Sequence, residues 1–125
     1  MSAFTAWSRI ASAALSSSMA VAAFASPADI PPPELRRLAA GAGWLPGSHL
    51  PGRQPDGNTV VREGPEGRVV LDTGRHPAHR QAILDLARRL GKPVAAIVNS
   101  HWHLDHVSGN PALKAAHPGA RVHAS

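Results

Sequence analysis

The sequence predicts an α/β fold of the α+β sandwich type, and three segments between residues 58 and 125 carry that prediction. A hairpin pattern comes first, an amphipathic helix pattern follows it, and a short apolar run then follows the helix. A helix that leads into a buried strand is typical of a layered α/β architecture. The 125 residues suffice for one domain at most.

The hairpin is predicted from two short segments rich in β-branched residues. Residues 59–61 read Thr-Val-Val and residues 68–71 read Arg-Val-Val-Leu, with the turn sequence Gly-Pro-Glu-Gly at 64–67 between them. Two strands joined by so short a turn pair antiparallel. Residues 72–74 (Asp-Thr-Gly) then end the second strand.

A helix is predicted over residues 78–90, where alanine, leucine and isoleucine recur at helical spacing. Pro77 stands near its start, and Gly91 stands just past its end. Pro93 blocks continuation of the helix, and residues 94–98 (Val-Ala-Ala-Ile-Val) form an apolar run. That run suits a strand buried on both faces of a sheet.

A further, shorter unit is predicted toward the end of the sequence. Asn110 can cap a short helix that has Pro111 in its first turn. Residues 121–124 then begin another strand. The sequence shows no internal repeat.

Residues 1–25 have the order of a secretory signal peptide. Arg9 precedes an Ala-rich run of about 15 residues, which is shorter than the roughly 20 residues that span a bilayer. The run ends in Ala23-Phe24-Ala25, so cleavage is expected after Ala25 and a periplasmic or secreted location follows. We expect no stable membrane association after cleavage. The alternative is an uncleaved anchor, because serines weaken the apolar run.

Residues 26–57 are rich in proline and glycine, and we interpret them as a lead-in arm to a partial domain at residues 58–125. Within the arm, residues 34–40 can form two helical turns, because prolines precede them and a glycine follows. Leu35 and Leu38 of that helix would pack on the domain.

The composition excludes several classes of function. Thirteen Lys and Arg residues against eight Asp and Glu give a net charge of +5, and removal of Arg9 with the signal peptide leaves +4. The basic residues are scattered, no basic stripe with interleaved aromatics appears, and tyrosine is absent, so nucleic-acid binding is not expected. Without cysteine, disulfides and thiolate metal ligands are excluded, which leaves imidazole and carboxylate ligands.

The segment His-Trp-His-Leu-Asp-His directly after the apolar run packs four potential metal ligands into six positions. If the segment begins in extended geometry, His101 and His103 point to one side and can chelate one ion, while Trp102 points away into packing. A turn toward a helix then brings Asp105 and His106 to a neighbouring position. That position suits a second ion about 3.5 to 4 Å from the first.

Imidazole and carboxylate ligands suit a divalent metal of borderline softness, so we expect one or two zinc ions, with iron or manganese as alternatives. Such a centre lowers the pKa of bound water to roughly 7 and directs hydroxide at a carbonyl or phosphoryl group. The cluster therefore predicts a metal-dependent hydrolase that acts on a small-molecule substrate. The alternative is a polar loop with incidental histidines or an adventitious metal site.

The sequence also suggests roles for four other residues near the cluster. Asp72 is either an ordinary strand-end carboxylate or an acceptor that orients a ligand imidazole, and both interpretations stay open. His76 and His79, beside the predicted helix start, are expected in ordinary surface or capping roles. Gly109 is expected to permit a close approach of the backbone to the site.

This part of the chain resembles the metallo-β-lactamase-fold superfamily of zinc hydrolases. Three features match in order: the opening strand at 58–61, the Asp-Thr-Gly sequence at 72–74, and the His-x-His-x-Asp-His motif at 101–106, which Ser-Gly-Asn follows at 108–110. The resemblance covers about residues 44–125 and implies the first half of an αββα metallo-β-lactamase fold.

The resemblance also implies roles for the four candidate ligands. His101 and His103 would bind the first zinc, and Asp105 and His106 the second, with a bridging hydroxide as the nucleophile. Asp105 is the candidate catalytic residue. Where the family often has threonine before the first histidine, this chain has Asn99-Ser100, a mild departure.

Family members complete both zinc sites with a later histidine, a bridging aspartate and a final histidine from the second half of the fold, and this sequence holds none of those positions. Fewer ligands per ion weaken metal binding, so we expect a truncated product with little activity unless another polypeptide supplies the remainder. Two hypotheses result. The first is an exported zinc hydrolase of an ester, thioester, lactone or lactam. The alternative is a non-catalytic fragment that binds metal weakly or not at all.

Overall fold

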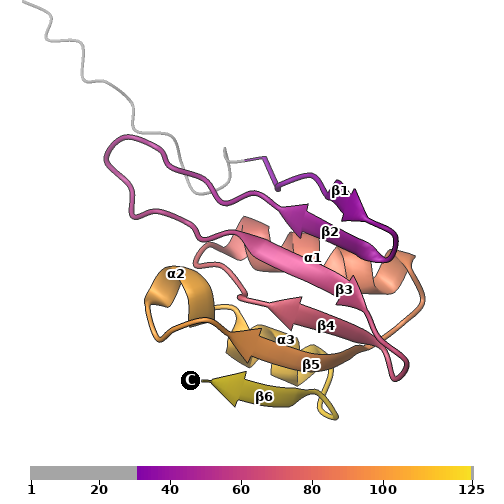
Figure 1. The fold of residues 1–125 in the computed structure, drawn as a ribbon. Coiled ribbons are helices and arrows are strands. Elements are labelled where there is room, and N and C mark those ends of the chain that lie inside the picture. Colours follow the sequence, from indigo (N-terminus) through magenta and orange to yellow (C-terminus); the bar gives the residue numbers. More distant parts are fainter. Residues whose placement is uncertain (1–30, 125) are drawn as a thin grey trace, which may run out of the picture.

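The computed structural model describes residues 31–124, so the predicted signal peptide at residues 1–25 lies outside the described residues. The described part forms one sheet with helices against it (Figure 1). No helix in this part of the chain has the length and apolar character that crossing a membrane requires. The elements in chain order are β1 (Arg36–Ala39), β2 (Ala42–Leu45), β3 (Thr59–Glu63), β4 (Arg68–Leu71), α1 (Pro77–Arg89), β5 (Val94–Asn99), α2 (Leu104–Val107), α3 (Asn110–Ala116) and β6 (Arg121–Ala124).

The strands follow the order β1-β2-β3-β4-β5-β6 across the sheet. From β1 to β4 they pair antiparallel, whereas β4, β5 and β6 pair in parallel. A parallel pair needs a crossover connection, and α1 supplies it between β4 and β5 as α3 does between β5 and β6. Both helices lie on one face of the sheet (Figure 1). The chain therefore has the α/β architecture that the sequence predicts.

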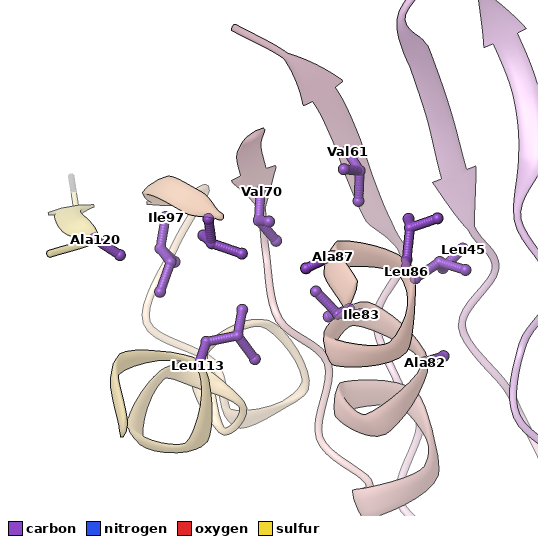
Figure 2. Close-up of a cluster of buried hydrophobic side chains, with 11 residues drawn as sticks. Leu45, Val61, Val70, Ala82, Ile83, Leu86, Ala87, Ile97, Leu113 and Ala120 are labelled. Atoms are coloured by element: carbon purple, nitrogen blue, oxygen red, sulfur yellow. The ribbon is translucent and has the colours of Figure 1, made fainter. Parts of the chain in front are cut away.

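The hydrophobic core lies between the sheet and this pair of helices (Figure 2). The sheet contributes Val61, Val70 and Ile97, which are 4%, 0% and 0% exposed. The helices contribute Ile83 from α1 and Leu113 from α3, which are 2% and 0% exposed. Each such side chain stabilises the fold by about 1.5 to 3 kcal/mol relative to full exposure. This layer holds β4 and β5 in the register that positions their carboxyl ends.

Replacing Ile97 with alanine is expected to lower the free energy of unfolding by about 2 to 5 kcal/mol, because it leaves a cavity in the layer between β5 and the helices. Urea unfolding followed by circular dichroism measures the change. Val122 lies on β6 and is 45% exposed, so Val122→Ala is the control, with an expected change of about 0.5 kcal/mol or less. Equal losses in the two variants would contradict this location of the core.

The hairpin, the long helix and the buried strand are confirmed. β3 and β4 pair antiparallel across the predicted turn, and α1 begins at Pro77 and ends at Arg89. Gly91 follows the helix with φ of 61°, a left-handed conformation that glycine adopts without steric cost. β5 differs in one respect: Ala95 and Val98 are only half-buried, because no helix of the described residues covers the other face of the sheet (Figure 1).

The predicted helix at residues 34–40 is wrong, because residues 36–39 form β1. β1 and β2 make an antiparallel hairpin around Gly41, which has φ of 69°. A helix of two turns is marginal on its own. The hairpin instead satisfies its backbone groups by pairing along β3.

The hairpin also changes the interpretation of residues 26–57 as an arm that only leads into the domain. β1 and β2 belong to the same sheet as β3, and Leu45 of β2 enters the core at 1% exposed. Leu35 and Leu38 do not pack as predicted, since they are 41% and 57% exposed. The second strand of the hairpin, not a helix, therefore anchors this segment.

The loop between β2 and β3 is attached to α1 by buried polar side chains. Asp56, Thr59 and His79 are 9%, 0% and 1% exposed. Thr59 Oγ1 lies 2.8 Å from His79 Nε2, and His79 Nδ1 lies 3.4 Å from Asp56 Oδ2. The backbone N–H groups of Arg75 and His76 donate to Asp56 Oδ1. The predicted surface or capping role of His79 is thus wrong, because its partners allow the ring to be fully buried.

Acidification is expected to destabilise the fold through Asp56. Burial by itself would raise the pKa of Asp56, but hydrogen bonds from His79 and from the Arg75 and His76 amides, with attraction to His79, hold the pKa below its usual 3.8. The unfolded chain then binds a proton more readily than the folded chain. The stabilisation is complete above the unfolded pKa and is lost as the pH falls below about 3.8 and through the folded pKa.

Urea unfolding measured from pH 6 down to about pH 3 tests this expectation, since that range crosses the usual carboxyl pKa. Asp56→Asn should show a shallower loss of unfolding free energy with acid than the unchanged chain. Glu66→Gln is the control, because Glu66 forms an exposed ion pair with Arg121. A parallel decline in the unchanged chain and in Asp56→Asn would contradict a lowered pKa of Asp56.

Candidate metal centre

Asp72 and the His101–His106 segment lie together at the edge where β4 and β5 end. β4 and β5 are parallel, and Leu71 at the end of β4 pairs with Val98 near the end of β5. The residues that follow the two strands therefore emerge at the same edge, where open α/β sheets commonly bind ligands. The single turn α2 then carries Asp105 and His106 back over this edge.

Asp72 is the hub of the hydrogen bonds at this edge. Its Oδ1 accepts the backbone N–H of Ser100 at 2.8 Å, and its Oδ2 accepts the Ser100 hydroxyl at 2.7 Å. The same Oδ2 lies 2.8 Å from His106 Nδ1. Asp72 has φ of 59°, a left-handed conformation uncommon outside glycine, and its side chain is only 8% exposed. Of the two interpretations of Asp72, this geometry matches the acceptor that orients a ligand imidazole.

Hydrogen bonding fixes which nitrogen of two imidazoles is available to a ligand. A carboxylate only accepts, so His106 Nδ1 carries a proton toward Asp72. The Ser100 hydroxyl donates its one proton to Asp72, so it accepts from His101 Nδ1 at 2.9 Å. In both rings Nε2 is then the nitrogen whose lone pair can bind a metal. Partners of this kind orient metal-binding histidines.

Asp105 faces the free nitrogen of His106. Asp105 Oδ2 lies 3.2 Å from His106 Nε2, and both side chains are about four-fifths buried. With Nδ1 protonated, Nε2 and a carboxylate oxygen are two acceptors in contact. Their lone pairs repel unless a positive charge lies between them. A proton on Nε2 or a cation bound by both atoms does so. This pair is therefore a fit for a borderline divalent metal by the chemistry of its donor atoms.

The three imidazole rings of the motif also gather closely. The ring centroids of His101 and His103 are 4.7 Å apart, and those of His101 and His106 are 4.0 Å apart. Within residues 31–124, however, no three or more His, Cys, Asp or Glu side chains form a group arranged to hold a metal ion. The donor types fit zinc, and the described residues bring the four predicted ligands together without a complete three-ligand geometry.

Trp102 does not pack as the sequence predicts. Its side chain is 79% exposed, with its ring centroid 4.6 Å from that of His103. Residues 101 and 102 form bends and not an extended segment, and in the described residues no apolar surface covers Trp102.

Neighbouring segments hold the backbone of α2 in place. Thr73 N–H donates to the His106 carbonyl at 2.8 Å, and Gly57 N–H donates to the Asp105 carbonyl at 3.1 Å. Asn99 Nδ2 also donates to the His106 carbonyl at 3.2 Å. Sequence reasoning missed these three contacts, because each joins residues at least seven positions apart. The Asn99-Ser100 departure from the family pattern was the available signal for Asn99.

Asn110 has a different function from the predicted helix cap. The N-cap position of α3 is Gly109, and it makes no side-chain capping bond. Asn110 Nδ2 instead donates to Asn99 Oδ1 at 2.7 Å, and Thr73 Oγ1 donates to Asn110 Oδ1 at 2.9 Å. The backbone at Gly109 approaches Thr73 closely, since a Cβ there would lie 2.3 Å from the Thr73 carbonyl oxygen, and its predicted approach to the metal site stays a prediction.

A mixed sheet whose parallel strands end beside clustered imidazoles and carboxylates defines an α/β protein with a candidate metal centre at its carboxyl edge. The sequence profile of the metallo-beta-lactamase superfamily matches residues 52–125, more than half of the chain. The chain belongs to this superfamily.

Individual relatives agree with that assignment. A hydroxyacylglutathione hydrolase from Gloeobacter violaceus is 47% identical over 49 residues, which are 39% of this chain and 19% of the relative. A metallo-beta-lactamase from Hirschia baltica is 26% identical with a TM-score of 0.62, over 75% of this chain and 43% of the other. A Pseudomonas aeruginosa metallo-beta-lactamase in a mono-zinc form shares the fold at 22% identity and a TM-score of 0.60, over 75% of this chain and 42% of the other.

The chain thus spans about a fifth of that hydrolase and less than half of the two lactamase structures. The named relatives are hydrolases or lactamases, and the predicted fold and superfamily are confirmed. The predicted ligand set has the surroundings described above, and its binding of metal remains a prediction.

Proposed function

We propose that this chain carries the metal-binding part of a zinc-dependent hydrolase that cleaves an ester, thioester, lactone or lactam in a small-molecule substrate. The observation that carries the proposal is the cluster at the carboxyl edge of the sheet, where Asp72 orients His106 and, through Ser100, His101. The superfamily and its hydrolase relatives support the same class of reaction.

The residues that would hold zinc are His101 and His103 for one ion, and Asp105 and His106 for another. When bound, zinc supplies Lewis acidity that polarises a substrate carbonyl and lowers the pKa of water. Asp72 keeps the proton of His106 on Nδ1, so Nε2 stays available as a ligand. Asp105 contributes negative charge beside that nitrogen, and its four-fifths burial limits competition from solvent.

Metal analysis and a substrate panel test this proposal together. The full chain is loaded with zinc, dialysed and analysed for metal, and then assayed on an ester, a thioester, a lactone and a β-lactam. About two zinc ions per chain with turnover of at least one substrate is the expected result for a two-metal hydrolase. A zinc content below roughly half an equivalent per chain, with no turnover of any substrate, would contradict the proposal.

A non-catalytic chain that binds metal weakly or not at all is the second candidate. The absence of a three-ligand group among residues 31–124 favours it, because affinity depends on ligand number and geometry. The same metal analysis separates the two candidates. Zinc below roughly half an equivalent, with a folded chain by circular dichroism, selects this second function.

Export is a separate part of the proposal. The basic start, Ala-rich run and Ala23-Phe24-Ala25 ending support secretion to the periplasm or beyond. Mass spectrometry of the chain recovered from the periplasm of an expression host should give a new N-terminus at Ser26. An uncleaved chain in the membrane fraction would contradict secretion and support the anchor.

A further inference from the structure

The polar cluster formed by Asp56, Thr59 and His79 lies outside the candidate metal centre and has no part in the proposed chemistry. It joins three elements, because Asp56 is in the loop before β3, Thr59 begins β3 and His79 is in the first turns of α1. All three side chains are at least nine-tenths buried. Burying so many polar atoms costs free energy unless each atom has a hydrogen-bond partner, so the presence of this cluster needs a physical explanation.

The first connection from this cluster to the metal centre is the residue after Asp56. Gly57 N–H donates to the Asp105 carbonyl at 3.1 Å. A Cβ on Gly57 would lie 2.4 Å from that carbonyl oxygen and 3.2 Å from Cε1 of the His106 ring. The backbone at position 57 therefore lies against Asp105 and His106, and Asp56 is its immediate neighbour in the chain.

The second connection runs through the loop after β4. Asp56 Oδ1 accepts the N–H groups of Arg75 and His76, which follow the segment that contains Asp72. In that segment Thr73 N–H donates to the His106 carbonyl at 2.8 Å. One carboxylate thus ties together the two loops that contact the backbone of Asp105 and His106.

We propose that Asp56, His79 and Thr59 are positioning residues that set the placement of Asp105 and His106 through Gly57 and Thr73. The proposal deepens the proposed function and rests on it for its consequence in metal binding. Its structural core, the placement of two side chains, is measurable without metal.

The hydrogen-bond order explains why the cluster needs these three side chains. Asp56 only accepts, so His79 Nδ1 carries a proton toward it, and Nε2 on the other side of the ring faces the Thr59 hydroxyl. Thr59 fixes the ring at 2.8 Å, and the ring in turn holds the Asp56 carboxylate against α1. An apolar residue at position 79 would leave the Thr59 hydroxyl and Asp56 Oδ2 buried without this partner, while Asp56 Oδ1 would keep the Arg75 and His76 N–H groups.

Thr59→Val and Thr59→Ser form the test pair, because valine keeps the shape of threonine and loses the hydroxyl, while serine keeps the hydroxyl. Asp56→Asn is a second disrupting variant, and it gives the same comparison if Thr59→Val does not fold. Ile83→Val on α1 is the control for general destabilisation, since Ile83 is 2% exposed in the apolar core. The measurement is NMR of the metal-free full chain, with amide exchange at Gly57 and Thr73 and the imidazole signals of His106.

Thr59→Val and Asp56→Asn are expected to speed exchange at Gly57 and Thr73 by about tenfold more than Ile83→Val, after correction for each variant's unfolding free energy. They should also shift the His106 imidazole signals, whereas Thr59→Ser should stay close to the unchanged chain. Zinc affinity, measured by competition with a chelator, should fall about tenfold in the same two variants.

Exchange at Gly57 and Thr73 that matches Ile83→Val, with unmoved His106 signals, would overturn the positioning role and leave a merely structural one. If the unchanged chain binds no zinc but the exchange and imidazole effects appear, the proposed function fails and the positioning role stands. If zinc binds but neither the exchange effect nor the imidazole effect appears, the positioning role fails and the proposed function stands.

Discussion

Replacing Asp105 with alanine is expected to lower the rate of hydrolysis by about a thousandfold or more, which corresponds to roughly 4 kcal/mol of transition-state stabilisation. Asp105 Oδ2 lies 3.2 Å from His106 Nε2, so the variant removes one donor atom and leaves the other without its partner. His101→Ala is expected to have a comparable effect through loss of the other candidate ion. Zinc content and turnover of the substrate panel are measured on the same samples.

Two control variants remove the same kinds of side chain, a carboxylate and an imidazole, at positions outside the candidate metal centre. Asp85→Ala removes a carboxylate from the exposed side of α1, where it accepts hydrogen bonds from Gln81 and Arg88. His49→Ala removes an exposed histidine from the loop after β2. Both should retain the zinc content and rate of the unchanged chain. Retention of most activity in Asp105→Ala would show that the motif is not the reaction centre.

Replacing Asp72 with asparagine is expected to weaken zinc binding by about 10- to 100-fold, the usual effect of losing a residue that orients a ligand histidine. Asparagine tolerates the left-handed backbone at this position, and its carbonyl oxygen can still accept from Ser100. Its amide group donates, however, so it cannot accept the Nδ1 proton of His106. The variant thus targets the orientation of the imidazole while retaining the fold.

Ser100→Ala separates the contact of Asp72 with His106 from its connection through Ser100 to His101. It removes the hydroxyl between Asp72 and His101 Nδ1 and leaves the contact between Asp72 and His106. We expect a smaller loss of zinc affinity than in Asp72→Asn. Chelator competition measures both values, and urea unfolding confirms that the variants are folded. Unchanged affinity in a folded Asp72→Asn would exclude the orienting role.

Local patterns predicted the central part of the fold well. The helix at 78–90 and the apolar strand at 94–98 were recognised because their hydrophobic periods and their flanking proline and glycine act within a few residues. The helix at 34–40 failed for the opposite reason. Its residues tolerate a helix locally, and pairing with β2 along the sheet edge overrides that preference.

Burial was predicted less well than secondary structure. His79 looked like a surface histidine beside a helix start, but Asp56 and Thr59 lie 23 and 20 positions away in sequence and supply its partners. Trp102 looked like a packing residue and is exposed. Neither outcome depends on neighbours in sequence, so periodicity could not reveal it.

By itself, the sequence determined the kind of chemistry available to this protein and the superfamily to which it belongs. Four donor side chains within six positions and the lack of cysteine are properties of the chain before it folds. Only the tertiary structure decided how those donors are held. The parallel pairing of β4 and β5 brings Asp72 to His106 across 34 positions, and Gly57 reaches Asp105 from a third segment. Hydrogen bonds of about 3 Å between distant segments require a folded backbone, and no local pattern encodes them.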